Sequence, residues 1–139
     1  MKNVIIIGAT SGIGRAVAEI YIRQGHRVGI TGRRSVLLDE IAAGAQAGKV
    51  FTKSFDVSDA SASRSLEELV ESMGGVDICL YSSGYGHTNT DLEPGLELGQ
   101  IDVNAKGFVR CAVWLFNYWA GNGLRGHLAV ISSVASILP

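Results

Sequence analysis

Five short apolar runs along the chain have the length and composition of β-strands. The first run is rich in β-branched residues and shows no alternation of polar and apolar positions, which is typical of a parallel strand buried on both faces. The fourth and fifth runs also predict buried strands, whereas the third mixes polar and apolar residues and favours a sheet edge. The predicted strands cover residues 2–7, 27–31, 50–55, 76–81 and 127–131.

Between these strands, apolar residues recur three and four positions apart, which is the spacing of one helical face. Ser35 is placed to cap the second helix, and a last helix is predicted over residues 96–121 with a break near Asn104. The expected inward-facing residues are Ile13, Val17, Ile20 and Tyr21 in the first helix, Leu37, Leu38 and Ile41 in the second, and Leu66, Leu69, Val70 and Met73 in the third.

Strands that alternate with helices pair in parallel through right-handed crossovers. The expected fold class is therefore α/β, with a Rossmann-type doubly wound parallel sheet of five strands in the order 3-2-1-4-5, in one domain over residues 1–139. Ligands of such sheets bind outside the carboxyl ends of the strands, near the point where the strand order reverses. We therefore expect the functional residues at this edge of the sheet.

The composition narrows the possible partners. Hydrophobic residues make up 47% of the chain and charged residues 18%, and the mean hydropathy is +0.24, which excludes a disordered or fibrous protein. Twelve Lys and Arg against 13 Asp and Glu give a net charge of −1 without a basic block, so we expect neither nucleic acid nor a membrane as partner.

Two further features concern location and metals. The apolar part of residues 1–8 is too short for a signal peptide or a membrane span, so a cytoplasmic protein is expected. Cys79 and Cys111 lie 32 positions apart in apolar runs, without a CxxC pair or zinc-ligand spacing. They are interpreted as reduced core residues, and no metal site is expected.

A glycine-rich turn joins the first predicted strand to the first predicted helix. Gly8 permits a tight turn, Gly12 lets the backbone approach a pyrophosphate at the helix N-terminus, and Gly14 allows the helix to pack close to the strand. Thr10, Ser11 and Ile13 belong to the same phosphate-binding turn. A glycine turn without a ligand is the alternative.

Two arginines follow the second strand, where enzymes that use NAD place a carboxylate for the ribose hydroxyls. The chain has Arg33 and Arg34 there and no acid. Because the guanidinium fork matches a 2′-phosphate, this pair favours NADP as cofactor. Either arginine could instead be a solvated turn residue.

These motifs and four later ones stand in an order that resembles the classical short-chain dehydrogenase/reductase family. The resemblance covers all 139 residues, and the ordered series is far more specific than any single motif. The motifs are GATSGIG at 8–14, TGRR at 31–34, Asp56-Val57, Ser82-Ser83-Gly84, Asn104 and Ile131-Ser132-Ser133.

The resemblance implies roles for several of these residues. Asp56 resembles the acid that hydrogen-bonds the adenine amino group, and Val57 the residue that packs on the ring. From its position alone, Asp56 could be only an acid near a helix N-terminus. The backbone of Ser82, Ser83 and Gly84 is expected to pass beside the cofactor.

The same segment departs from the family. Tyr81-Ser82-Ser83-Gly84 stands where the family has Asn-Asn-Ala-Gly, and both asparagines are absent. The side-chain bonds that brace the central strand in the family are therefore expected to be replaced by hydroxyls or lost.

The resemblance also implies catalytic residues. Ser133 resembles the serine that hydrogen-bonds the substrate oxygen, and Asn104 the helix asparagine whose backbone carbonyl holds a water of the proton relay. Asn104 could instead be a mere helix break. In the family a Tyr-x-x-x-Lys pair follows the serine, on a domain of seven strands, but no tyrosine follows Ser133 here. A truncated and inactive form is therefore expected.

The expected parent activity is NADP-dependent interconversion of a carbonyl and an alcohol on a small-molecule substrate by hydride transfer. The alternatives are an NADP-binding module without catalysis and a structural protein that binds nothing. Residues 108–120 are apolar on nearly every side, so we expect a homo-oligomer formed through the helix over residues 104–121.

Overall fold

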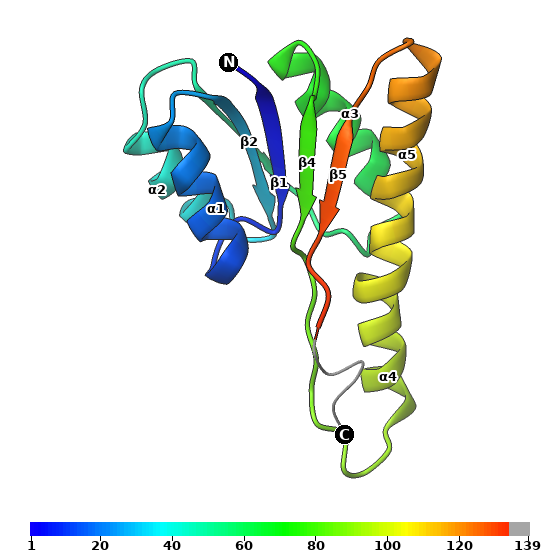
Figure 1. Ribbon diagram of the computed structural model, residues 1–139. Coiled ribbons are helices and arrows are strands. Elements are labelled where there is room, and N and C mark those ends of the chain that lie inside the picture. The colour runs from blue at the N-terminus through cyan, green and yellow to red at the C-terminus, as the bar shows by residue number, and fades with distance from the viewer. Residues whose placement is uncertain (134–139) are drawn as a thin grey trace.

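A parallel five-stranded sheet forms the centre of the computed structural model, which describes residues 1–133 (Figure 1). Its strands are β1 (Asn3–Ile7), β2 (Arg27–Gly32), β3 (Val50–Ser54), β4 (Ile78–Tyr81) and β5 (His127–Val130). Every neighbouring pair is parallel and the order is β3-β2-β1-β4-β5. The predicted fold class and strand order are confirmed, and β3 lies at an edge as its mixed polarity indicated.

Helices cover both faces of the sheet (Figure 1). One face carries α1 (Gly12–Arg23) and α2 (Ser35–Ala43), and the other carries α3 (Ala62–Met73) and α5 (Phe108–Gly121). The segment before α5 consists of α4 (Pro94–Ile101) and a π-helical turn, η1 (Asp102–Gly107). The predicted break near Asn104 is this turn.

The face that α1 turns to the sheet is the predicted one only in part. Val17 and Tyr21 pack against the core as expected, but Ile13 and Ile20 are 57% and 43% exposed, whereas Gly14 and Ala18 are buried. A Cβ on Gly14 would lie 2.0 Å from the carbonyl oxygen of Gly8, so α1 packs too closely for a large side chain at this position. Hydrophobic spacing was misleading for Ile13 and Ile20 because small residues make the closest contact.

Two further expectations are corrected. Ser35 does not cap α2: it is the first helical residue, and Arg34 occupies the N-cap position without a side-chain bond to the helix. The strand β5 is not buried on both faces, since Val130 is 48% exposed. It lies at the second edge of the sheet, where β4 is its one neighbour among the described strands.

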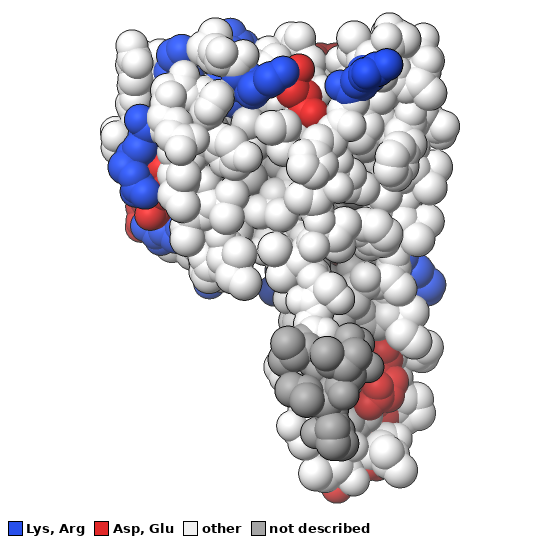
Figure 2. Space-filling model, in the orientation of Figure 1, with Lys and Arg blue, Asp and Glu red and all other residues white. Residues whose placement is uncertain are grey.

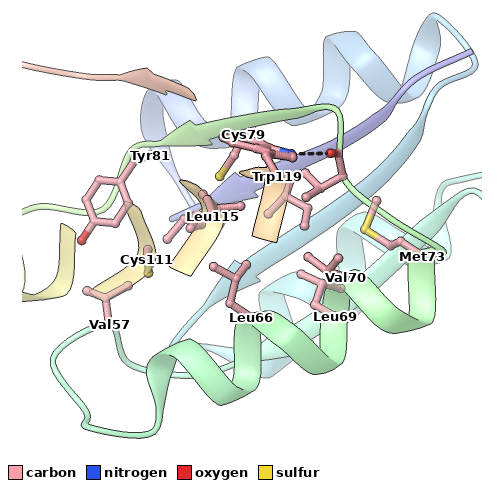
Figure 3. Close-up of a cluster of buried hydrophobic side chains, with 13 residues drawn as sticks. Val57, Leu66, Leu69, Val70, Met73, Cys79, Tyr81, Cys111, Leu115 and Trp119 are labelled. Atoms are coloured by element: carbon pink, nitrogen blue, oxygen red, sulfur yellow. Dashed lines mark hydrogen bonds between the residues drawn. The ribbon is translucent and has the colours of Figure 1, made fainter. Parts of the chain in front are cut away.

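The core between the sheet and the helices α3 and α5 contains the α3 residues and the cysteines that the sequence predicted to be buried (Figure 3). All four expected residues of α3 are buried against residues of β4 and α5: Leu66, Leu69, Val70 and Met73. Cys79 and Cys111 are buried free thiols in the same cluster. Burial raises the pKa of Cys111 to about 12, so its thiol is neutral and behaves as an apolar core group.

Replacement of Leu66 tests this core. Leu66→Ala removes a side chain with no exposed surface and should lower the free energy of unfolding by about 2–5 kcal/mol, because a cavity remains. The matched control Leu124→Ala, at a residue that is 49% exposed, should change it by less than about 0.5 kcal/mol. Urea unfolding followed by circular dichroism measures both, and equal effects would contradict the assigned packing.

Candidate functional site

A pocket of about 150 Å³ opens at the carboxyl edge of the sheet, where the chain leaves β1, β2, β3 and β4. It brings together ten of the residues singled out in the sequence: Gly8, Thr10, Ser11, Arg33, Arg34, Asp56, Val57, Ser82, Ser83 and Gly84. Its lining also includes Thr31 and Gly32, which belong to the TGRR motif but were given no role of their own, and three residues that the sequence interpretation missed: Phe55, Tyr85 and Val103. Each of these three is the direct neighbour of a residue that was singled out, and this adjacency was the available signal.

The glycine turn forms one wall of this pocket. Gly8 has a φ of +89°, and a Cβ on it would lie 2.8 Å from the backbone nitrogen of Ser83, so a side chain would close the approach between the two loops. Gly12, with a φ of +57°, begins α1, and no neighbouring atom restricts the space in front of it. The turn is therefore an open cradle at a helix N-terminus, which suits a pyrophosphate.

Not every residue of the turn faces the pocket. Gly12, Ile13 and Gly14 are absent from its lining, and Gly14 instead packs against the carbonyl of Gly8. The side chain of Ile13 is largely exposed, so its backbone N–H in the first helical turn is the group available to an anion.

The two arginines have different surroundings. The guanidinium of Arg34 donates hydrogen bonds to the hydroxyls of Thr10 (2.8 Å) and Ser11 (3.3 Å), which fastens the end of β2 to the glycine turn. Arg33 is exposed and lines both this pocket and an adjoining one of about 430 Å³. Arg33 is therefore the cation more available to a ligand phosphate.

Asp56 closes the pocket beside Arg33. Burial by itself would raise the pKa of its carboxyl, but the backbone N–H and hydroxyl of Ser58 donate to Oδ1 at 2.9 and 2.7 Å, and the charge of Arg33 acts in the same direction. These interactions outweigh burial and hold the pKa of Asp56 below its ordinary value. Asp56 is thus an ionised acceptor at neutral pH.

A larger pocket of about 640 Å³ lies on the other side of the loop that follows β4. Asn104 and Ser133 both line it, although 29 positions separate them in the sequence (133 − 104). The loop residues Ser82 to Tyr85 line both pockets and form the wall between them. The side chain of Asn104 accepts from the backbone N–H of Tyr85 (2.9 Å) and donates to its carbonyl (2.7 Å).

Residues 1–133 show neither a candidate metal centre nor a candidate membrane span. No cluster of three or more His, Cys, Asp or Glu side chains in this part of the chain could hold a metal ion. None of the helices described there is long and apolar enough to cross a membrane.

The strand order, together with a glycine turn that precedes a helix N-terminus at the carboxyl edge, defines a Rossmann-type dinucleotide-binding class. The family model described as short chain dehydrogenase matches residues 2–139. The chain therefore belongs to the short-chain dehydrogenase/reductase family of oxidoreductases, whose cofactors are nicotinamide dinucleotides, and the resemblance seen in the sequence is confirmed.

Individual relatives agree with this assignment. A glucose 1-dehydrogenase of Gluconobacter oxydans is 29% identical over 99% of this chain and 54% of its own length. A short chain dehydrogenase from Bacillus anthracis superposes with a TM-score of 0.90 at 26% identity, over 98% of this chain and 58% of that one. An alcohol dehydrogenase from Thermococcus sibiricus, solved with 5-hydroxy-NADP, superposes with a TM-score of 0.85 at 28% identity. This match covers 100% of this chain and 61% of that one. The chain thus spans about half the length of the curated relative.

The state of Asp56 can be tested by titration. Ser58→Ala removes a hydroxyl donor and should raise the pKa of Asp56, measured from the carboxyl ¹³C chemical shift against pH. Because the folded-state pKa is depressed, the stabilisation that these bonds give is present above the unfolded-state pKa and is lost as the pH falls through the folded-state value.

Ser72→Ala is the matched control for this titration. The Ser72 hydroxyl donates to the carbonyl of Leu69 at 2.7 Å, so its loss should leave the pKa of Asp56 unchanged. An unchanged titration in Ser58→Ala would show that this hydroxyl does not stabilise the carboxylate.

Proposed function

We propose that the chain carries the cofactor-binding part of an NADP-dependent oxidoreductase that interconverts a carbonyl and an alcohol. The observation that carries the NADP preference is the pair Arg33 and Arg34 on the rim of the pocket, where β2 ends. Their guanidinium groups suit a 2′-phosphate, and the end of β2 carries no carboxylate that would repel the phosphate charge. The related alcohol dehydrogenase solved with 5-hydroxy-NADP supports the same choice.

The residues of the first pocket fit the parts of this cofactor. The pyrophosphate would lie on the cradle of Gly8 and Gly12 at the N-terminus of α1, which a side chain on Gly8 would obstruct. Arg33 would hold the 2′-phosphate, while Arg34 keeps Thr10 and Ser11 in place. The ionised Asp56 would accept from the adenine amino group, beside Val57.

The second pocket would receive the reacting end and the substrate. When bound, the cofactor supplies or accepts the hydride. Ser133 would hydrogen-bond the substrate oxygen at the floor shared with Asn104. The proton would be exchanged by a tyrosine, and residues 1–139 contain none after Ser133. By themselves, these residues should therefore bind NADP without turning it over.

Reversal of one charge tests the cofactor assignment. Arg33→Asp should weaken NADPH binding by about 10–100-fold, because one charge-assisted hydrogen bond to the 2′-phosphate is lost. The affinity for NADH, which has no 2′-phosphate, should change little or increase. Isothermal titration calorimetry measures both affinities. Arg23→Asp, the same change on the exposed end of α1, is the control. Equal NADPH affinities before and after Arg33→Asp would refute the role of Arg33.

We also propose that the chain self-associates through α5 and its surroundings. Val109, Val113 and Phe116 of α5 are 54%, 53% and 58% exposed, and Val130 adds to them on β5. Figure 2 shows few charged side chains over β5 and the adjoining surface. An exposed apolar area of this kind is typical of an interface with another protein surface.

Light scattering after size exclusion tests this association. The chain should elute with at least twice its monomer mass of 14.7 kDa, and Val113→Glu should shift it to the monomer because it buries a charge in the contact. Val36→Glu, at a residue of α2 that is 67% exposed, should leave the mass unchanged. A monomeric wild-type chain would contradict the proposal.

A further inference from the structure

Two side-chain hydrogen bonds fasten β4 and its preceding turn to the helical segment that packs on it. Before the strand, Trp119 Nε1 donates to the carbonyl of Val76 at 2.8 Å, the dashed contact in Figure 3. At its carboxyl end, the hydroxyl of Tyr81 donates to the carbonyl of Val103 at 3.2 Å. The second bond joins the strand to the π-helical turn η1.

The environment of Tyr81 keeps this hydroxyl in place as a donor. Tyr81 is 3% exposed, and its ring meets that of Phe108 edge to face at 5.3 Å. Burial, followed by the nearby Cys111, raises the pKa of the Tyr81 hydroxyl above its ordinary value, so the group stays protonated. A Cβ on Gly107 would lie 2.7 Å from a methyl group of Val57 and 3.0 Å from the Tyr81 hydroxyl, so a glycine there lets the turn approach both side chains.

The turn that receives this bond also holds the wall between the two pockets. Asn104 follows Val103 directly and bonds the backbone of Tyr85 with both its amide oxygen and its amide nitrogen. Tyr85 lines the smaller and the larger pocket. A continuous path therefore runs from the Tyr81 hydroxyl through Val103 and Asn104 to Tyr85.

We propose that Tyr81 is a positioning residue, whose hydroxyl fixes the π-helical turn so that Asn104 holds the Tyr85 wall between the cofactor pockets. Tyr81 touches neither cofactor nor substrate in this assignment and acts through Asn104. It stands at the position where the family has the first asparagine of Asn-Asn-Ala-Gly, and its longer side chain reaches from β4 to the turn. The cofactor effect expected below rests on the proposed NADP function.

Removal of the hydroxyl alone provides the first test. In Tyr81→Phe the ring remains packed, but the carbonyl of Val103 loses its donor. The amide hydrogen exchange of Tyr85 in the ligand-free chain should accelerate by roughly 3–10-fold, which corresponds to the net stabilisation that one hydrogen bond provides. The exchange rates of the β1 amides should stay unchanged. Tyr118→Phe, which removes a hydroxyl near the other end of α5, is the matched control.

A double-mutant cycle with Asn104→Ala tests the path. Asn104→Ala removes both bonds to Tyr85, so adding Tyr81→Phe should not accelerate Tyr85 exchange further. Additive effects would overturn the proposal, because Tyr81 would then act independently of Asn104. Equal acceleration at Tyr85 and in β1 would also overturn it, since the hydroxyl would then affect only global stability.

Cofactor titration gives the functional outcome. Tyr81→Phe should weaken NADPH binding by about 3–10-fold. Binding of adenosine 2′,5′-bisphosphate, which lacks the nicotinamide half, should change by less than about twofold, because Arg33 and Asp56 are untouched. If the wild-type chain binds NADPH and Tyr81→Phe binds it equally well, the positioning role is wrong. If the wild-type chain binds no NADPH, the proposed function fails, and Tyr85 exchange alone decides the role of Tyr81.

Discussion

The close approach of α1 to the end of β1 is the constraint on which the rest of the site depends. Gly14 lies against the carbonyl of Gly8, and Ala18 is fully buried one turn further on. This contact places the N-terminus of α1 at the carboxyl edge of a sheet whose central strand is fully buried from Val4 to Ile7. The N-terminus of α1, whose first N–H groups have no partner within the helix, therefore lies next to the glycine turn that lines the pocket. Larger side chains at these positions would move the helix and the cradle together.

The opposite layer organises the second half of the site. The helix α5 is held against the sheet by buried apolar side chains, and the π-helical turn before it brings Asn104 to the carboxyl edge. The loop that follows β4 lines both pockets, and the two hydrogen bonds between Asn104 and the backbone of Tyr85 hold it in place between them. At this edge, residues that follow β1, β3 and β4 line one pocket together with residues of β2 and η1.

The two arginines on the rim of the smaller pocket make different contacts. Both arginines are exposed, but the Arg34 guanidinium donates to Thr10 and Ser11 and so holds the glycine turn, whereas the charge of Arg33 acts on Asp56. Adjacent arginines of identical chemistry thus have different surroundings, because Arg34 has neutral hydroxyl partners within reach. A chain with both arginines free would hold its glycine turn less firmly.

The strand order, the buried residues of α3 and ten residues of the smaller pocket follow from the sequence alone, because glycines, cations and apolar runs at strand ends have strong local signatures. The sequence could not determine which face of α1 is buried, since that depends on how closely two backbones approach. Nor could it show the exposure of β5, the engagement of Arg34 or the bond from Tyr81 to Val103. These join residues 22 to 24 positions apart or depend on sheet neighbours, so only the packed tertiary structure decides them.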